Sequence, residues 1–229
     1  MKYINLFEEF KIKPRAVDVP VYSTGQRPVT ADNKKVIRKQ DLIVATDKTI
    51  MQIVKSEIAR LGKDADLNHI DVSQVTDMSA LFAKTDFQGD VSQWDVSNVK
   101  YMYYTFERCF DFNCDLSGWN VSSVKDMNGM FYYCSKFNQD ISSWDVSKVT
   151  DMNWMFYYCT DFNQDLSKWD VSNVEKMYGM FCNCFNFNQD ISCWDISKVV
   201  TNMSFMFYGS SIKEEYKPKF KNIKYKNII

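Results

Sequence analysis

The chain has 229 residues, of which 45% are hydrophobic and 25% charged, and its formal net charge at pH 7 is −1. This composition is typical of a folded protein, and it contains no run of about 18 apolar residues that could cross a membrane. The charge is unevenly distributed, because residues 66–211 carry −10 whereas residues 1–65 carry +5 and residues 212–229 carry +4. Such asymmetry affects association and solubility and does not determine the fold.

Residues 1–45 are predicted to form an extended N-terminal arm that begins with a short amphipathic helix. Pro14 would end that helix, and two further prolines favour irregular structure after it. The helix either packs on the rest of the chain or docks on another protein. Its apolar residues, which would make the contact in both cases, are Ile4, Leu6, Phe7 and Phe10.

The opening segment also bears on location. Glu8 and Glu9 interrupt it where a signal peptide has a continuous apolar core. We therefore expect an intracellular protein or a component of a viral particle in preference to a cell-surface protein. In such a location the seven cysteines are expected to be reduced thiols.

Residues 46–65 are predicted to form a capping helix that starts at Thr46 or Asp47. Apolar side chains recur on one face of it, at Ile50, Ile53, Val54, Ile58 and Leu61. The segment after the helix, Asp66–Ser73, aligns with Asp140–Ser147. The helix therefore takes the place of the helix in a preceding repeat, and we expect it to cover the first layer of the core.

The rest of the chain is organised by a repeat of fixed length. Tryptophan recurs every 25 residues, at Trp94, Trp119, Trp144, Trp169 and Trp194. A constant step of this size indicates one structural unit that is repeated and stacked. We predict a solenoid of about six copies over residues 66–211, in which a degenerate first copy starts at Ile70 and the last copy has one extra residue.

Each copy is predicted to contain a short strand and a helix. Trp144–Val146 suits a strand, with the apolar side chains inward, and Ser147 suits a helix N-cap. The following apolar residues have helical spacing, at Val149, Met152, Met155, Phe156 and Cys159. The predicted fold class is α/β: a leucine-rich-repeat-like solenoid of strand–helix repeats with an N-terminal helical cap and a C-terminal capping strand.

The copies resemble the BspA-like leucine-rich repeats, in the variant W-D-V-S-x-V-x-x-M-x-x-M-F-x-x-C-x-x-F-N-Q-D-[LI]-S that is common in mycoplasmas and other microbes. The matching copies are Trp94–Ser117, Trp119–Ser142, Trp144–Ser167 and Trp169–Ser192. The resemblance implies a curved solenoid with a role in binding, often at cell surfaces. It implies no catalytic residues and no cofactor.

Equivalent positions of the copies form columns with separate expected roles. The tryptophan column and two phenylalanine columns are predicted to be core, and the cysteine column is predicted to pack as small apolar side chains. The asparagine column from Asn113 is expected to form a ladder to the backbone of the adjacent coil. Two aspartate columns, from Asp95 and from Asp115, either bond to turn amides or hold calcium between coils.

Residues that bind a partner should stand where the copies differ, because the shared positions make the fold. Ten residues after each tryptophan, large aromatic residues alternate with glycine. Such rings, which are favoured interface anchors, could stand as knobs beside gaps or could simply cover neighbouring coils. The predicted partner-binding residues are Tyr104, Trp154, Phe205, Tyr132 and Tyr157.

Residues 212–229 are predicted to form a basic C-terminal cap, because lysines alternate there with aromatic and apolar residues as in a protected edge strand. The same alternation could contact nucleic acid, but the acidic body of the chain argues against a nucleic-acid partner.

No nucleophile–base pair, phosphate-binding loop or metal-ligand cluster is visible in the sequence, so an enzyme is not expected. The preferred interpretation is a non-catalytic protein-interaction or structural solenoid within a larger assembly. One alternative is a surface, adhesin-like binding module. Another is a bacteriophage virion protein docked by its N-terminal arm, since the opening MKYINLFEEF is similar to leaders of large-bacteriophage proteins.

Overall fold

The structure is a computed structural model that describes residues 42–201, 203 and 205–219. The predicted arm with its docking residues Ile4, Leu6, Phe7 and Phe10 lies outside the described residues, except for its last four positions. Residues 220–229 of the predicted C-terminal cap also lie outside them.

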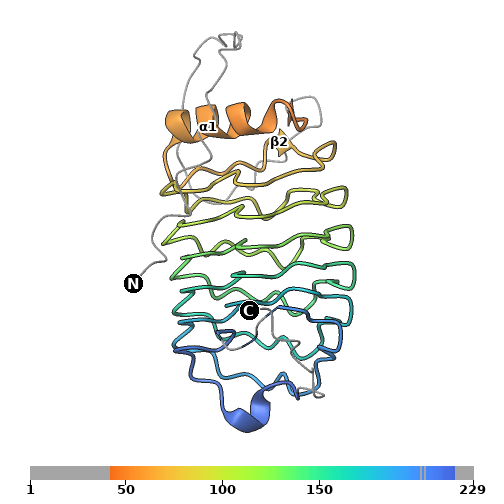
Figure 1. The fold of residues 1–229 in the computed structure, drawn as a ribbon. Coiled ribbons are helices and arrows are strands. Elements are labelled where there is room, and N and C mark those ends of the chain that lie inside the picture. The colour runs from red at the N-terminus through yellow and green to blue at the C-terminus, as the bar shows by residue number, and fades with distance from the viewer. Residues whose placement is uncertain (1–41, 202, 204, 220–229) are drawn as a thin grey trace, which may run out of the picture. The chain divides into compact units, whose positions relative to one another are not determined.

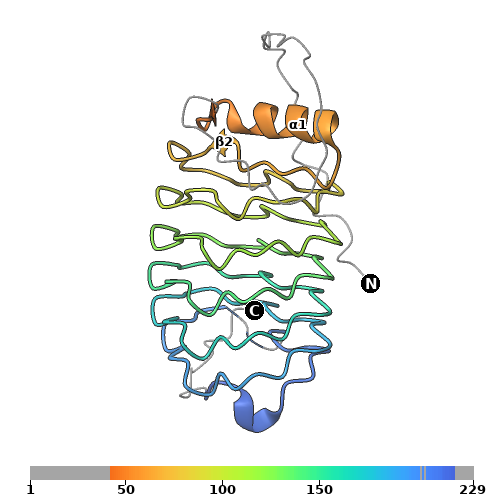
Figure 2. The same ribbon diagram turned by 180° about the vertical axis from the view of Figure 1, so that it is seen from behind.

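Most of the described chain runs as successive coils that stack on one another (Figures 1 and 2). Helix α1, Ile50–Leu61, lies across the first coil, and the short 3-10 helix η2, Glu214–Tyr216, lies at the other end of the stack. Neighbouring coils are joined by isolated parallel bridges along one line, through Asp77, Tyr101, Asp126, Asp151 and Lys176. We call this line the bridge line.

A short strand pair stands beside the first coil. Strand β1, Ile43–Val44, pairs in parallel with strand β2, Ile70–Asp71, and Ile43 lies opposite Ile70 in the register. The amide of Ala45 continues this pairing, since its N–H donates to the Asp71 carbonyl oxygen at 2.8 Å. The chain before α1 therefore adds one more layer of backbone to the stack.

The start of the predicted capping helix is corrected by the structure. Helix α1 begins at Ile50, its N-cap residue is Thr49, and no side chain caps it. Asp47 instead accepts hydrogen bonds from the N–H groups of Thr76 and Asp77, at 2.6 and 3.1 Å, and from the Thr76 hydroxyl at 2.7 Å. Burial alone would raise the pKa of Asp47, but these bonds to Thr76 and Asp77 lower it.

Asp47 supplies the hydrogen-bond acceptor that a preceding coil supplies elsewhere in the stack. In the next coil the corresponding amide, Lys100 N–H, donates to the Thr76 carbonyl oxygen at 2.8 Å. Within residues 42–75, the described part of the chain before Thr76, no coil offers a carbonyl at this place, and the Asp47 carboxylate supplies the acceptor that a backbone carbonyl supplies elsewhere. The prediction that residues 46–65 cover the first layer agrees with the buried face of α1, which includes Ile50 and Val54.

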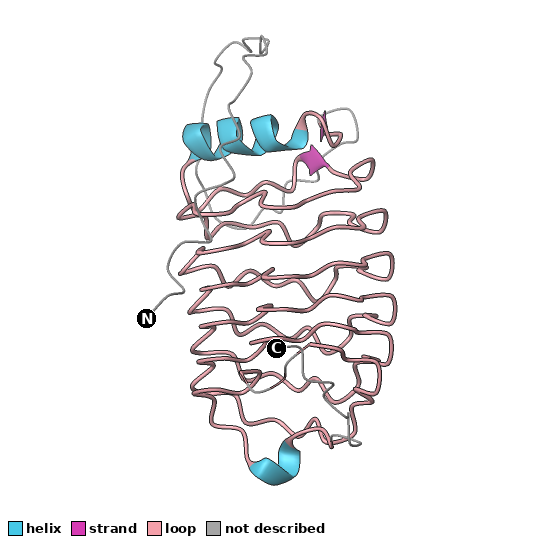
Figure 3. Cartoon of the chain, in the orientation of Figure 1, coloured by secondary structure: helices cyan, strands magenta, loops and turns pink. Residues whose placement is uncertain are grey.

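The helix predicted within each copy is wrong. The residues after each Trp-Asp-Val segment form turns, and among the described residues α1 is the only α-helix (Figure 3). Alternate amides point to the next coil: Gly129 donates to the Asn153 carbonyl oxygen at 2.8 Å, and Phe131 donates to that of Met155 at 2.9 Å. An α-helix would use those N–H groups internally, so the coil-to-coil bonds exclude it.

In five of the coils two residues adopt positive φ, which also breaks a helix. In the coil from Trp119 they are Gly129 and Tyr133, with φ of 58° and 61°. Each is the third residue of a four-residue turn that is closed by a backbone hydrogen bond, as in type II turns. In the turn that contains Gly129, the Met130 N–H donates to the Met127 carbonyl oxygen at 3.1 Å. Apolar residues spaced 3 apart fit these turns as well as they fit a helix.

The predicted strand at Trp144–Val146 is also absent; the strands of the described chain are β1 and β2. The reason is that the nearby amides are used locally. Ser147 N–H donates to the Asp145 carboxylate at 3.0 Å, and Val149 N–H donates to the Val146 carbonyl oxygen at 2.9 Å. These Asx and backbone turns bend the chain where a strand would run straight.

The predicted core columns are confirmed. The repeat tryptophans are only 3–4% exposed, and the Phe106, Phe131, Phe156 and Phe181 column is fully buried. Each indole N–H donates to a carbonyl of the preceding coil; the bond from Trp144 to Leu116 is 3.0 Å long. Phe131 and Phe156 stack at 5.7 Å with an interplanar angle of 8°. Each buried ring contributes roughly 2 kcal/mol or more from its apolar area.

The polar columns are used for structure. The asparagine ladder is confirmed: the N–H of Asn163 donates to Asn138 Oδ1 at 2.9 Å, and the same bond recurs along the column. Asx bonding of the two aspartate columns is confirmed too, since Asp140 and Asp145 each accept the N–H of the serine two residues on. These bonds lower the pKa of both carboxyls.

Candidate functional site

The predicted partner-binding residues lie on one side of the coils, in the segment that follows the bridge line. Their rings form a continuous series of contacts across five coils. We call this set the aromatic belt, and define it as Tyr104, Tyr132, Tyr133, Trp154, Tyr157, Tyr158, Tyr178 and Phe205.

Two pairs of tyrosines form the centre of the belt. Tyr132 stacks on Tyr157 with ring centroids 4.8 Å apart, and Tyr133 stacks on Tyr158 at 4.7 Å. The two pairs meet edge to face, since Tyr157 lies 5.4 Å from Tyr133 at an angle of 68°. Such offset and perpendicular contacts are favourable for aromatic rings.

Trp154 continues the belt toward the last coil. Its ring meets Tyr157 at 5.0 Å and Tyr178 at 4.6 Å, both nearly perpendicular. Tyr178 in turn lies 5.6 Å from Phe205, which is 44% exposed. Trp154 and Tyr178 are half-buried, so the belt offers ring edges and part of its faces to solvent.

The expected gaps beside the large rings are filled. A Cβ atom added at Gly129 would overlap the Tyr104 ring, and one added at Gly179 would overlap the Trp154 ring. Each large ring therefore lies over the glycine of the next coil. The structure agrees with the alternative that these rings partly cover neighbouring coils, and it leaves their outer sides accessible.

Four of the eight belt residues also sit on an unusual backbone. Tyr104, Trp154, Tyr133 and Tyr158 have φ between 54° and 61°, a left-handed conformation that costs a residue with a Cβ about 1–2 kcal/mol. Equivalent positions in other coils carry either glycine, where the conformation has little steric cost, or residues that bear the same cost, among them Ala80 and Arg108. Tyr104 and Trp154 thus occupy sites at which glycine fits the backbone better.

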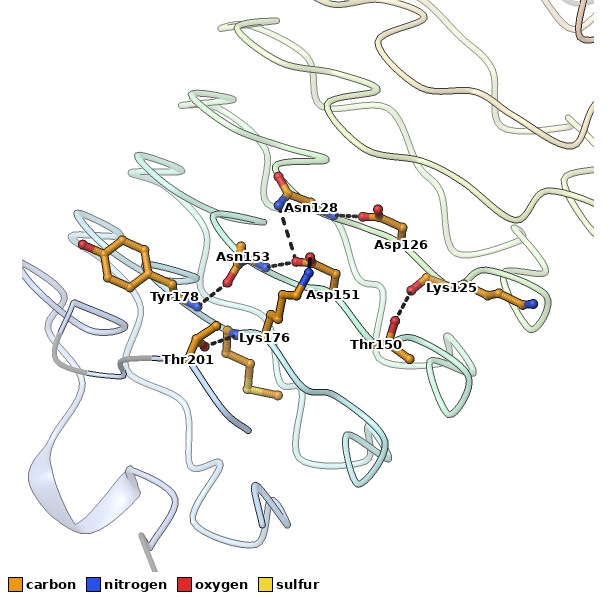
Figure 4. Close-up of polar contacts among 10 residues, drawn as sticks. Lys125, Asp126, Asn128, Thr150, Asp151, Asn153, Lys176, Tyr178 and Thr201 are labelled. Carbon is orange, nitrogen blue, oxygen red and sulfur yellow. Dashed lines mark hydrogen bonds and ion pairs between the residues drawn. The ribbon is translucent and has the colours of Figure 1, made fainter. Parts of the chain in front are cut away.

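A polar patch along the bridge line supports the belt (Figure 4). Lys176 Nζ lies 3.0 Å from Asp151 Oδ2, and Asn153 Oδ1 accepts the Tyr178 N–H at 2.7 Å. The bond with Asp151 raises the pKa of Lys176, so the ion pair persists at neutral pH. These contacts fix the backbone from which Trp154 and Tyr178 project.

Burial is the main cause of the pKa shifts of three belt tyrosines and of Asp126. Burial raises the pKa of Tyr132 to about 12 and also raises the pKa of Tyr104 and of Tyr157, so these phenols are neutral and can donate hydrogen bonds. Burial likewise raises the pKa of Asp126, and the charge of neighbouring Asp151 acts in the same direction.

The side chains that could support other chemistry are occupied or buried. The thiol of Cys159 donates to the Phe131 carbonyl oxygen at 2.9 Å, and burial raises its pKa well above the usual value. All seven cysteines are free. Among the described residues, no three His, Cys, Asp or Glu side chains are grouped so as to hold a metal ion. Neither described helix has the length and hydropathy needed to cross a bilayer.

Two parts of this surface were not predicted from the sequence. Tyr178 precedes the glycine in its copy, and the equivalent position carries tyrosine, asparagine or serine in the other copies. That variation was the available signal. The ion pair of Asp151 and Lys176 joins residues 25 positions apart, which only the alignment of copies brings together. The predicted docking residues of the N-terminal arm cannot be placed relative to the belt, since they lie outside the described residues.

Stacked 25-residue coils with aligned core columns and a variable outer surface define the chain as a repeat protein. More narrowly, it belongs to the family described as “Mycoplasma protein of unknown function, DUF285”, whose model matches residues 51–153 and 134–224. The expected likeness to mycoplasma-type repeats is confirmed at this level. Neither the curated proteins nor the solved structures contain a match to the chain.

Proposed function

We propose that the chain is a non-catalytic protein-interaction unit of a larger assembly and that the aromatic belt is its binding surface. The stacked coils act in this proposal as a solenoid of the leucine-rich-repeat type, in its BspA-like variant, which holds the belt rigid. Tyrosine and tryptophan are enriched at protein interfaces because they offer large contact areas with a polar edge and lose little side-chain freedom.

The observation that carries the proposal is the placing of large rings at strained backbone positions. Gly179 meets the left-handed requirement that Trp154 meets at a steric cost. At the equivalent position of the first coil Ala80, at φ 55°, meets the same requirement with a small side chain, so the backbone does not call for a large ring at position 154. The indole at position 154 is therefore explained by a task on the outer surface, for which partner binding is the simplest candidate.

The polar surroundings suit a protein partner. The phenol groups of Tyr132 and Tyr157 are neutral donors, and the nearby pair of Asp151 and Lys176 offers both charges. Interfaces commonly combine an aromatic centre with a polar rim of this kind. The proposal therefore expects the partner to cover Tyr157 and Trp154 and to contact the polar patch at its edge.

The binding proposal is tested by affinity capture from the organism that encodes the chain, with the full chain as bait. Trp154→Gly combined with Tyr157→Ala should lose a partner that the unaltered chain retains. Met51→Ala combined with Leu61→Ala, which removes exposed apolar groups from α1, should retain it. Equal capture by all three baits would contradict the proposal.

A bait that lacks residues 1–41 separates the belt from the N-terminal arm. This deletion leaves β1 in place. If the truncated bait loses the partner while the Trp154 variant keeps it, the arm is the docking element and the belt is not.

The solenoid assignment has its own test, which does not depend on a partner. Removal of residues 145–169 joins Trp144 to Asp170 and deletes one complete copy. A solenoid should stay folded and become shorter by about 5 Å, the usual spacing of hydrogen-bonded neighbours. If the shortened chain failed to fold, the solenoid assignment would be contradicted.

A further inference from the structure

Toward the first coils, the aromatic belt ends beside a group of charged side chains. The Arg108 guanidinium lies over the Tyr133 ring, 5.7 Å from its centre. Glu107 Oε1 lies 3.7 Å from Arg108 Nε and 3.8 Å from Lys84 Nζ. We call Lys84, Glu107 and Arg108 the basic end of the belt, because two cations share one carboxylate there.

The cations of the basic end face solvent, whereas its carboxylate does not. The side chains of Lys84 and Arg108 are 60% and 51% exposed, and Glu107 is buried. Both ion-pair distances are longer than a hydrogen bond, so Glu107 attracts the two cations through charge. Glu107 and the Tyr133 ring thus hold Arg108 in place while its side chain stays accessible.

The stacking of the coils does not require these charges. In other coils the position of Glu107 carries Ala83, Tyr132, Tyr157 or Cys182. The position of Arg108 carries Tyr133, Tyr158 or Asn183. The backbone bonds are the same in both cases, since the N–H groups of Arg108 and of Tyr133 each donate to the next coil at 2.7 Å. A role outside the stack is therefore open to the charged side chains.

The rings next to the basic end also favour negative groups. Tyr132 and Tyr157 stack within 10° of parallel, and Tyr133 and Tyr158 within 5°. Stacking covers the ring faces, which are the negative part of an aromatic ring, and leaves the positive edges and the phenol groups for a partner. Edges and hydroxyl donors both attract oxygen atoms, so this surface suits carboxylates and carbonyls better than cations.

The charge balance favours a peptide carboxylate over a nucleic acid. Residues 66–211 carry −10, and a phosphate backbone needs many cations to offset such repulsion. Two neighbouring cations suit a single carboxylate, which arginine binds well. At the opposite edge of the belt Lys176 is paired with Asp151 at 3.0 Å, so the excess of positive charge lies at the basic end.

We propose that the bound segment of the protein partner carries a glutamate or aspartate that pairs with Arg108 and Lys84. This inference rests on the proposed function, in which the same partner covers Trp154. Arg108 and Trp154 belong to coils two steps apart, a separation of roughly 10 Å along the stack. An extended segment spans that distance with about three residues. The acidic residue should therefore stand about three positions from the residue that covers Trp154.

The test is a selection of peptides from a random library of displayed dodecapeptides on the full chain. Peptides that bind the unaltered chain and not Trp154→Gly should be enriched in glutamate or aspartate about three positions from an apolar residue. Belt-binding peptides without this enrichment would overturn the inference and leave the proposed function standing. If no selected peptide depends on Trp154, the inference fails as well, and the affinity capture described above decides separately whether the belt binds a folded protein.

Paired substitutions then identify the contact. Arg108→Gln should weaken a selected peptide about tenfold, whereas Lys148→Gln, which removes an exposed lysine from the turn after Trp144, should not. Changing the acidic residue of the peptide to glutamine should weaken its binding to the unaltered chain by a similar factor and have no further effect on Arg108→Gln. Equal effects on both chains would overturn the proposal. Lys84→Gln takes the same place in this cycle if Arg108→Gln does not fold.

Discussion

Adjacent residues in the same coils build two aromatic stacks that differ in kind. Phe131 and Phe156 stack at 5.7 Å inside the core, and their next neighbours Tyr132 and Tyr157 stack at 4.8 Å on the surface. The inner column repeats in every coil, because each layer has the same space to fill. The outer column changes from coil to coil, and Glu107 occupies the equivalent position one coil before Tyr132.

The difference shows which residues the stack requires. A fixed coil-to-coil spacing aligns equivalent side chains whether they are inside or outside, so a ring ladder is by itself no sign of function. Identity in every copy marks the residues that make the fold. Under the proposed function, a large ring at a position with a steric cost, as at Trp154, serves partner binding and not the fold.

The largest expected effect is on the inner column. Phe156→Ala should destabilise the chain by about 3–5 kcal/mol, because it removes a fully buried ring and leaves a cavity between two stacked neighbours. Urea unfolding measures the loss, and Tyr157→Ala is the paired control, with an expected loss of under about 1.5 kcal/mol. Equal losses at both positions would remove the distinction between the inner and outer stacks.

A smaller effect is expected where the belt crosses glycine. Gly179→Ala adds a Cβ at φ 62° and forces the Trp154 ring to move, so it should cost about 1–3 kcal/mol. Gly118→Ala serves as its control, because φ there is not positive and the nearest atom, Ser92 O, is 3.8 Å from the added Cβ. Thermal unfolding of the two variants should therefore differ; similar melting temperatures would show that position 179 is not constrained.

Two substitutions of Trp154 measure the backbone strain at that position. Trp154→Gly and Trp154→Ala lose nearly the same ring contacts, but only glycine relieves the left-handed conformation at φ 58°. Trp154→Gly should therefore be more stable than Trp154→Ala by about 1 kcal/mol. The reverse order would mean that the backbone at position 154 stores no strain.

The smallest effect concerns the Asx turns that both stacks share. The bonds from Ser147 lower the pKa of Asp145, so this carboxylate adds stability above its unfolded pKa, near 4, and loses it as the pH falls through its folded value. Asp145→Asn should keep the turn, as Asn120 does, and should flatten the acid side of the stability curve slightly. Asp145→Ala should lose the turn bond at every pH, and equal curves for the two variants would reject this role.

The core and the ladders could be predicted from the sequence because the repeat aligns identical side chains. Trp144, Phe156 and Asn138 each contact the equivalent residue of the next copy. The 25-residue step in the sequence therefore predicts these contacts directly. The turns could not be predicted in the same way. Steps of 3 suit both a helix and a series of turns, and a tyrosine at position 133 gives no sign that its φ is positive.

The start of the capping helix was missed for a different reason. Asp47 is a good N-cap by local rules, yet it bonds Thr76, which is 29 residues away. Capping preferences depend on residues nearby in the sequence, so they cannot predict that Asp47 accepts a hydrogen bond from the first coil. The belt was predicted in part, since Tyr104 and Trp154 stand where the copies differ, but the polar patch of Asp151 and Lys176 depends on the stacking itself.

The central claim is that the belt binds a protein partner, and the most direct measurement is the affinity of the purified partner for Trp154→Gly. The account predicts binding weaker by at least about 30-fold, as expected for an interface anchor, with a free energy of unfolding close to that of the unaltered chain. Met51→Ala should bind normally. Unchanged affinity of Trp154→Gly would contradict the account and remove the belt as the binding surface.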